Sequence, residues 1–348
     1  MKIVTNSEGI FDIGVIGIGE QSWDNLLPAL AVNEAFNITA VSDIDRNKRE
    51  IAARNYGATP YPDHATLLRE HSVDVLVVAS QPQVHYEVLK SAIPEGIPTF
   101  VEKPPALDIS QLYSLANLNQ KHKTPTAVGL NFNFAEPVNF LKGLIEDEGF
   151  GEIECIKICH MGDKPTNTMW GLPTISKSFL LSQAIHPLGL LFSLGKPSGE
   201  FDPCIHSYSN EYGVTFNVNM VLSQVGSGAK FTADLLTKSS APFFQWELKI
   251  TSTKGVIVNI NSLFEIEVYS HCGYNDFIKK RKWWRETWKP SPLSGGYERN
   301  GYALQFNDFV NHIMDGTDSA ASIEAMVPVY ELMEAMDSSL KHSDVVVA

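Results

Sequence analysis

Short apolar runs in the first third of the chain alternate with segments of helical periodicity. Phe11–Ile16, Ile38–Val41 and Val73–Ala79 are expected strands, and the last is apolar almost throughout. Such continuous runs are typical of strands covered on both faces. Asp45 offers an N-cap to a following helix, and Gly57 is placed to end it. This alternation predicts a parallel, doubly wound sheet. Further strands are expected at Thr99–Val101 and Thr126–Leu130, and further helices around residues 26–30, around residues 86–93 and after Asp108.

The pattern changes after Asn131. Runs of period two follow one another between residues 212 and 269 with no helical segment between them. Strands without intervening helices indicate an antiparallel sheet, so the second part of the chain is predicted to be an α+β domain. We expect domains at residues 1–127 and 128–348. The expected strands are Ile153–Ile158, Val214–Val221, Lys230–Leu236, Phe244–Thr251, Gly255–Ile260 and Phe264–Tyr269, and the expected helices are Val138–Glu148, Phe179–Leu194, Ala303–Met314 and Ile323–Lys341.

The composition of the chain mainly excludes certain partners and targeting segments. The 348 residues are 44% hydrophobic and 19% charged, which suits about two globular domains. A net charge of −13 argues against nucleic acid or an anionic membrane as partner, because both favour a basic surface. The N-terminal residues turn polar too early for a signal peptide, and no apolar run approaches the ~20 residues that span a bilayer. We therefore expect a soluble, cytoplasmic protein.

The four cysteines give no indication of a metal site. Cys155, Cys159, Cys204 and Cys272 form no C-x-x-C pair and have no zinc-like spacing. Cys155 and Cys159 would share one face of a strand. We expect buried structural thiols and no bound metal.

A glycine turn follows the first expected strand. Gly17, Ile18, Gly19 and Ser22 form a G-x-G-x-x-S variant of the dinucleotide fingerprint. The first glycine makes the tight turn, and the second lets the backbone approach a pyrophosphate at a helix N-terminus. Ser22 stands where a third glycine serves helix–strand packing, a position at which a small residue is tolerable.

An acidic residue ends the second expected strand. Asp43 occupies the position from which a carboxylate bonds the ribose hydroxyls of a dinucleotide. It favours NAD, because a carboxylate would repel the additional phosphate of NADP. Arg46 lies close enough to leave NADP as the alternative cofactor.

A second motif, Val101–Pro105, lies where the fifth strand of such a sheet should end. Its sequence is Val-Glu-Lys-Pro-Pro, and with the glycine turn it puts Lys103 where a bound nicotinamide ring would be. A glycine turn and an exposed lysine are each common alone. Their order and spacing indicate a dehydrogenase site.

With both motifs, the chain resembles the glucose–fructose oxidoreductase, inositol dehydrogenase and rhizopine-catabolism family (Gfo/Idh/MocA). The likeness spans nearly the whole length. It implies a Rossmann domain, a C-terminal domain with an open antiparallel sheet, NAD or NADP, and oxidation or reduction of sugars and related polyols. In the family that sheet often mediates oligomer contacts, so a homodimer or homotetramer is expected. The matching residues are Gly17–Gly19, Pro28–Leu30, Ala40–Asp43, Val77–Ser80, His85, Gly96–Pro104, Val128–Asn131, Ile185–His186 and Phe306–Val310.

The resemblance assigns roles to individual residues. It places Lys103 beside the nicotinamide and the reacting carbon–oxygen bond, where an ammonium can steady a developing alkoxide or relay its proton. Glu102 would pair with its neighbours, and Pro104 would set the turn through a cis bond. The implied cofactor residues are Gly17, Ile18, Gly19, Ser22, Asp43, Arg46, Ser80, Gln81, His85, Glu102 and Lys103, and the implied substrate residues are Lys103, Asn131, Gln183 and His186.

The family's second motif, D-x-G-x-H, aligns with residues 182–186. His186 is kept and is the natural general base, with an intrinsic pKa of about 6.5. Ser182 replaces the aspartate, so that carboxylate cannot orient the substrate or raise the basicity of the imidazole. Asn133 stands where the family commonly has arginine, which leaves substrate polarity open.

A basic, aromatic segment at residues 277–289 breaks the acidic character of the chain. It holds six basic residues, one acid and three of the six tryptophans. We interpret it as a sheet edge or an oligomer contact. The alternative is a surface that stacks a sugar ring and binds a phosphate handle.

The leading function is an NAD(P)-dependent oxidoreductase acting on a secondary alcohol or ketone of a carbohydrate-like small molecule. Reduction of an imine is a neighbouring alternative, since the missing aspartate leaves room for it. The alternative from another class is a non-catalytic dinucleotide-binding regulator. Retention of Lys103 and His186 argues against the regulator.

Overall fold

The computed structural model describes residues 10–271, 284–317, 319 and 321–343. The chain forms two compact units. Unit 1 comprises Met1–Asn131 and a returning segment, Gly295–Tyr330; unit 2 comprises Phe132–Ser294 and Glu331–Ala348. The expected division at residue 127 differs from this, because it assigns the returning segment to the second domain.

Unit 1 is built on a six-stranded parallel sheet of order β3-β2-β1-β4-β5-β6. The order reverses between β1 and β4, which is the switch point of a doubly wound sheet. The predicted fold class of this part is therefore confirmed. The strands are β1 (Phe11–Ile16), β2 (Phe36–Ser42), β3 (Thr59–Tyr61), β4 (Val75–Val78), β5 (Thr99–Glu102) and β6 (Thr126–Gly129), and the helices are η1 (Ser22–Leu26), α1 (Leu27–Ala31), α2 (Arg46–Tyr56), α3 (His64–Glu70), α4 (Pro82–Glu95) and α5 (Ile109–His122).

Local signals set the helix ends. The Asp45 side chain accepts hydrogen bonds from the amides of Asn47 and Lys48, and Gly57 has a φ of 70° at the end of α2. Both are as predicted. The short edge strand β3 was not predicted, because two of its three residues are exposed and Pro60 interrupts any apolar pattern.

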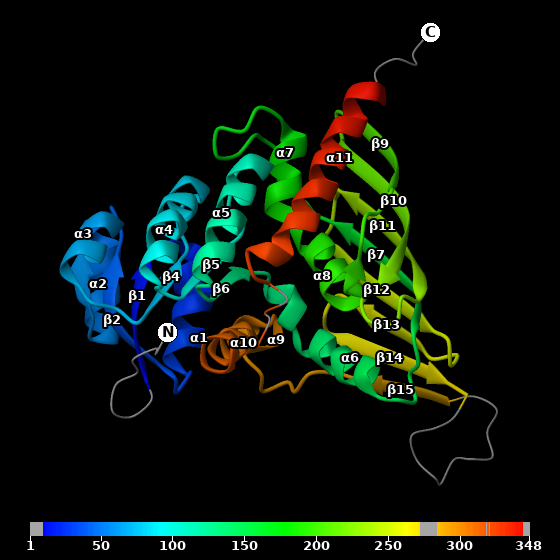
Figure 1. The fold of residues 1–348 in the computed structure, drawn as a ribbon, viewed down its shortest axis with the longest axis horizontal. Helices are drawn as coiled ribbons and strands as arrows, with labels where there is room; N and C mark the ends of the chain where they lie inside the picture. Colours follow the sequence, from blue (N-terminus) through cyan, green and yellow to red (C-terminus); the bar gives the residue numbers. More distant parts are fainter. Residues whose placement is uncertain (1–9, 272–283, 318, 320, 344–348) are drawn as a thin grey trace. The chain divides into compact units, whose positions relative to one another are not determined.

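The returning segment completes the core of unit 1. It contains α9 (Gly296–Arg299), α10 (Tyr302–Asp315) and η5 (Glu324–Met326), and it leads into α11 (Val327–Ser343). The rings of Phe100 and Phe306 lie 4.7 Å apart, and Phe36 meets Phe306 edge-on at 6.0 Å. In Figure 1 the orange α10 lies beside the blue α1, which it contacts.

Unit 2 contains a nine-stranded sheet of order β15-β14-β13-β12-β7-β11-β10-β8, with β9 paired to β10. It is mixed, because β7 pairs parallel with β11 and antiparallel with β12. The purely antiparallel expectation is corrected in this detail: β7 lies between β11 and β12, and these two strands run in opposite directions. The strands are β7 (Ile153–Met161), β8 (Pro197–Ser198), β9 (Cys204–Asn210), β10 (Gly213–Gln224), β11 (Lys230–Lys238), β12 (Gln245–Ser252), β13 (Ile257–Asn261), β14 (Glu265–Ser270) and β15 (Trp284–Trp288).

Helices of unit 2 cover one face of its sheet. They are α6 (Glu136–Glu146), α7 (Ile175–Phe179), η3 (Leu180–Ala184) and α8 (Ile185–Gly195), and all residues of α8 are buried. The continuous stretch Ile175–Gly195 is long and apolar enough to span a membrane, but 94% of its apolar window is buried inside the protein. It therefore has the character of a core helix.

The basic segment is described only in its second half. Trp284–Trp288 forms β15, which lies at the edge of the sheet beside β14, so the predicted edge position is confirmed there. Trp288 stacks on Phe140 with ring centroids 5.3 Å apart. Residues 277–283 lie outside the described residues.

The cysteines differ from the expectation in part. Cys155 and Cys159 are half-buried, whereas Cys204 is exposed, so that thiol is not a core residue. Cys272 lies outside the described residues. Within the described ranges, no group of three or more His, Cys, Asp or Glu residues is arranged to hold a metal ion.

Candidate active site

The glycine turn leaves open space where a dinucleotide needs it. Gly17 has a φ of +91°, and a Cβ added there would lie 2.3 Å from the carbonyl oxygen of Ala79. A Cβ added to Gly19 would meet nothing within 4 Å. Ser22 is buried, and its hydroxyl donates to the Gly17 carbonyl at 2.5 Å. The turn thus excludes a side chain at its first glycine and offers an open cradle at its second, which fits a pyrophosphate.

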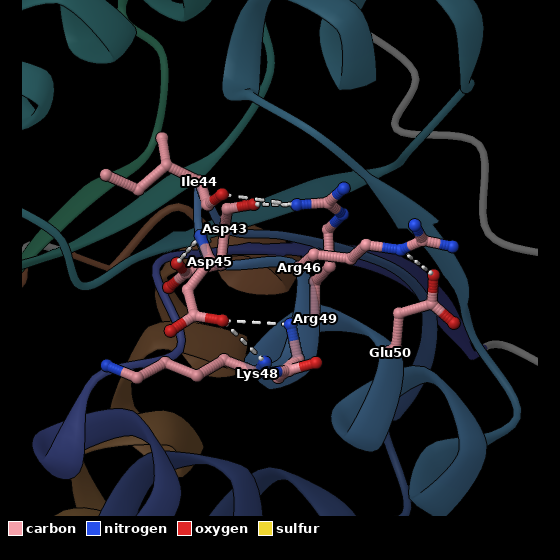
Figure 2. A network of polar contacts seen from close by, with 8 residues as sticks. Asp43, Ile44, Asp45, Arg46, Lys48, Arg49 and Glu50 are labelled. Atoms are coloured by element: carbon pink, nitrogen blue, oxygen red, sulfur yellow. Dashed lines mark hydrogen bonds and ion pairs between the residues drawn. The ribbon is translucent and has the colours of Figure 1, made fainter.

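Asp43 is joined to the turn by a direct hydrogen bond. Its Oδ2 accepts from the amide of Ile18 at 2.7 Å, and its Oδ1 accepts from the amide of Asp45 at 2.7 Å. Figure 2 shows the surrounding charges. Arg49 donates to the main-chain carbonyls of Asp43 and Ile44, whereas Arg46 pairs with Glu50 at 3.2 Å. The carboxylate is therefore joined to the glycine turn, and the Arg46 guanidinium pairs with an acid on its own helix.

Glu102, the last residue of β5, carries a buried carboxylate. Glu102 is 5% exposed, and its side chain accepts from the amide of Lys103 at 3.2 Å and from Nε2 of Gln21 at 3.4 Å. Burial raises the pKa of Glu102 and lowers the pKa of Lys103, and the charge of each partner opposes the shift of the other. The Lys103–Pro104 peptide bond is cis, as the resemblance implied.

His85 joins the loops after β4 and β5. Its Nδ1 donates to the Pro104 carbonyl at 2.9 Å, and its Nε2 accepts from the amide of Ser80 at 3.0 Å. Burial lowers the pKa of His85 to about 4, which keeps the ring neutral. Both ring nitrogens are engaged within the protein. Any part that His85 has in cofactor binding would therefore act through the position of Ser80 and Pro104. Gln81 follows Ser80 as the exposed N-cap of α4.

The predicted cofactor residues of unit 1 thus gather at the carboxyl ends of β1, β2, β4 and β5. This edge of a doubly wound sheet is where ligands bind. Asn131 also belongs to unit 1, and its Nδ2 donates to the carbonyl oxygen of Asn300 at 2.8 Å.

The predicted catalytic residue His186 and the predicted substrate residue Gln183 lie around a π-helical turn of unit 2. Ser182 and Gln183 are in η3, a π-helix, and His186 is in the first turn of α8. π-helical turns are rare and are frequent at functional sites. The ring of His186 lies 4.7 Å from that of Phe132, and this histidine is only 6% exposed. Lys103 belongs to unit 1 and His186 to unit 2.

Two polar residues near this turn were not predicted. His160 on β7 is paired across the sheet with Trp246 on β12, and both are fully buried. The His160 Nδ1 bonds to the hydroxyl of Thr237 at 3.0 Å. The His160 Nε2 and the Trp246 Nε1 have no hydrogen-bond partner among the described residues. Buried polar atoms are usually paired, so these two atoms are exceptions.

Phe132 and Gly162 connect these residues to the π-helical turn. The Phe132 ring also meets the Trp246 ring at 5.9 Å, and a Cβ added to Gly162 would lie 3.5 Å from Oε1 of Gln183 and 3.7 Å from the His160 ring. The signal in the sequence was a histidine at an inward position of an alternating strand. Asn133 is also fully buried, and its amide has no partner among the described residues.

Comparison with known proteins agrees with the fold of unit 1. A family model, GFO_IDH_MocA, described as an oxidoreductase family with an NAD-binding Rossmann fold, matches residues 11–130. The chain is similar to the inositol 2-dehydrogenase/D-chiro-inositol 3-dehydrogenase of Lactiplantibacillus plantarum, with 31% identity over 143 residues. The match covers 40% of this chain and 41% of that protein, so it spans less than half of either.

Solved structures match almost the whole chain. A dehydrogenase from Chromobacterium violaceum superposes with a TM-score of 0.86 and 29% identity, over 97% of this chain and 99% of that one. GenD2 from gentamicin A biosynthesis, solved in complex with NAD, gives a TM-score of 0.70 and 21% identity over 97% and 95% of the two chains. At that identity the second likeness concerns the fold alone.

Proposed function

We propose that this chain, which belongs to the Gfo/Idh/MocA oxidoreductase family, transfers a hydride between NAD and a secondary alcohol or ketone of a sugar or sugar alcohol. The observation that carries the proposal is the continuity of one site in unit 1. Gln21 of the glycine turn donates to Glu102, which adjoins Lys103. The turn that suits a pyrophosphate and the lysine suited to the reacting oxygen therefore belong to one hydrogen-bonded group.

The residues of unit 1 hold the cofactor in this proposal. The amides of the glycine turn receive the pyrophosphate, and Asp43 accepts from the ribose hydroxyls. NAD is preferred over NADP, because the 2′-phosphate would meet the charge of Asp43 while Arg46 is engaged by Glu50. When bound, the nicotinamide supplies the hydride acceptor or donor. Lys103 places a positive charge beside the substrate oxygen and stabilises it as its proton leaves.

The residues of unit 2 handle the proton and the substrate. His186 takes the proton of the substrate hydroxyl in oxidation and returns it in reduction. The free ring nitrogens of His160 and Trp246 bond to further hydroxyl groups of the substrate, which explains why two polar atoms are buried without partners. Ser182 replaces a carboxylate, so the substrate is expected to differ from a simple polyol at the group that Ser182 faces.

The proposal is tested by turnover. Nicotinamide absorbance is followed with inositols, sugars, nucleotide sugars and amino-sugars, in both directions. Lys103→Ala is expected to lower kcat by at least about 100-fold, because the charge beside the oxygen is lost. Lys121→Ala, at an exposed position of α5 in the same unit, is the matched control. Unchanged turnover in Lys103→Ala would contradict the proposal.

A regulator that binds the dinucleotide without chemistry is the second candidate. The observation that favours it is Ser182, which replaces the acid of the catalytic motif. Tight NAD binding together with no turnover on any substrate of the panel would support it. The same panel with imine substrates tests the neighbouring activity of imine reduction.

A further inference from the structure

Glu102 carries a buried carboxylate directly beside the ammonium-bearing Lys103. We propose that Glu102 is a positioning residue that holds Lys103 charged and in place at the end of β5, and that Gln21 holds the Glu102 carboxylate in turn. The inference rests on the proposed function in one respect, the role of Lys103 in the reaction. The arrangement itself belongs wholly to unit 1.

The neighbouring strand is shaped to admit this carboxylate. Glu102 on β5 is paired in register with Gly129 on β6. A Cβ added to Gly129 would lie 2.7 Å from Oε1 and 2.8 Å from Cδ of Glu102. Real Cβ atoms do not approach so closely, so a side chain at residue 129 would push the carboxylate away from its place. The missing side chain at Gly129 therefore makes room for Glu102.

Gln21 ties the carboxylate to the dinucleotide turn. Its Nε2 donates to the Glu102 Oε1 at 3.4 Å, and its Oε1 accepts from Nδ2 of Asn25 at 3.2 Å. The amide is thus oriented by a residue one turn further along η1. Because Gln21 directly follows the Gly17–Glu20 turn, the position of Glu102 depends on the segment that would bind the pyrophosphate.

Tyr302 of the returning segment lies near the same carboxylate. Burial, and to a smaller degree the charge of Glu102, raises the pKa of Tyr302 to about 12, so this phenol stays protonated. Tyr302 is the first residue of α10 and lies far from the other members in sequence. The nucleotide-binding motifs alone therefore give no indication of it.

Charged and titratable neighbours of the pair can be named among the described residues. His85 from α4 senses the charge of Lys103 and is itself neutral, and Tyr302 from α10 senses the charge of Glu102. Gln21 and Gly129 carry no charge. An ionised Glu102 favours the ammonium form of Lys103 against the cost of burial.

The test measures the amine of Lys103 without any substrate. The full-length protein is acylated with acetic anhydride at a series of pH values, and labelling of the Lys103 peptide is followed by mass spectrometry. Only the neutral amine reacts, so the midpoint of labelling against pH reports the charge state of the Lys103 amine. Removing the carboxylate in Glu102→Gln is expected to move the midpoint to lower pH by about one unit or more. Glu102→Asp keeps the charge and should restore part of this shift.

The residue that holds the Glu102 carboxylate has a matched pair of variants. Gln21→Leu removes the amide that donates to Glu102 and should move the Lys103 midpoint in the same direction by a smaller amount. Gln120→Leu, at an exposed position of α5, should leave it unchanged. Labelling of Lys121 serves as the internal reference in every variant. If Glu102→Gln does not fold, as judged by thermal unfolding, Glu102→Asp and Gln21→Leu decide the matter.

The outcomes separate the inference from the proposed function. A Lys103 midpoint that is the same in wild type and Glu102→Gln would overturn the inference, because Glu102 would then be neutral or too distant to act. If Lys103→Ala loses turnover but the Lys103 midpoint does not shift in Glu102→Gln, the proposed function is supported and the inference is not. A clear shift with no turnover on any substrate would support the role of Glu102 and count against the proposed function.

Discussion

Gly17 and Gly19 lie two residues apart in the dinucleotide turn but face different surroundings. A methyl group at Gly17 would collide with the main chain at Ala79 and would occupy a strained φ, whereas one at Gly19 would enter open space. The first glycine is thus required by the fold, and the second is predicted to be required by the ligand. This difference separates structural from binding roles within a single motif.

The two substitutions are predicted to have opposite signatures. Gly17→Ala should lower the free energy of unfolding by about 1–3 kcal/mol. The alanine would have to adopt a positive φ, and its methyl group would collide with the Ala79 main chain. Gly19→Ala should leave stability nearly unchanged but weaken NAD binding by about tenfold or more, because the methyl group fills the cradle. Urea unfolding and NAD titration measure the two effects. Equal NAD affinity in Gly19→Ala and wild type would contradict the placement of the pyrophosphate.

Because His160 is buried, we predict that the free energy of unfolding falls in acid. Burial lowers its pKa to about 4 in the folded protein, against about 6.5 in an unfolded chain. Between these values the unfolded state binds the proton and the folded state does not, so stability is full above about pH 6.5 and falls as the pH drops towards 4. The loss from this one group is about 2 kcal/mol between pH 7 and pH 5.

The variant His160→Gln isolates that contribution. Glutamine does not titrate, so the difference in unfolding free energy between pH 7 and pH 5 should shrink by about the same 2 kcal/mol. His206→Gln, on the exposed strand β9, should leave the difference unchanged. Urea unfolding at the two pH values is the measurement. An unaltered pH dependence in His160→Gln would show that this histidine is charged in the folded state.

At the level of elements, α10 is part of the nucleotide-binding unit although it follows unit 2 in sequence. Phe306 is fully buried against Phe36 and Phe100 of the parallel sheet. Phe306→Ala should therefore destabilise the protein by about 3–5 kcal/mol and weaken NAD binding with it. Phe264→Ala, which alters a ring that is 49% exposed, is the control for loss of an aromatic side chain. A change below about 1 kcal/mol in Phe306→Ala would contradict this packing.

Elements with a strong local pattern were predictable from the sequence. The apolar run Val73–Ala79 contains β4, and the cap pair Asp45 and Gly57 bounds α2. Strand β9 was not predicted, because its sequence Cys-Ile-His-Ser-Tyr-Ser-Asn is mostly exposed and polar and shows no apolar period. The docking of α10 was not predicted either. Its amphipathic pattern shows that one face is buried but not which partner covers it.

The same distinction applies to the residues of the candidate site, since some belong to a local motif and others meet only in the folded structure. The glycine turn, Asp43 and Lys103 could be found because their chemistry fixes their order and spacing. Gln21 acts through a hydrogen bond to Glu102, which is far from it in sequence, so no local pattern marks it. His160 and Trp246 became visible only as a cross-strand pair with unpartnered ring nitrogens.

At the scale of the whole molecule, the sheet of unit 2 leaves one broad face exposed. Helices α7 and α8 lie on one side of the sheet in Figure 1. The other face carries polar side chains and a shallow hollow of about 470 Å³. Lys157 and Asp234 form an ion pair of 3.1 Å on it, and Asn217 and Asn219 are exposed there. A large face that carries both charges and paired polar groups can meet a second copy of itself about a twofold axis.

The oligomer expected from the sequence is therefore predicted to form through this face. Light scattering after size-exclusion chromatography should give the mass of a dimer or tetramer of the 38.5 kDa chain. Asn217→Arg places a long charged side chain in the hollow of this face and should reduce the mass to that of smaller species, because like charges would meet across the axis. Asn210→Arg, at the exposed end of β9, should leave the mass unchanged. A wild-type protein that is monomeric at micromolar concentration, or an Asn217→Arg variant with the wild-type mass, would show that this face does not join subunits.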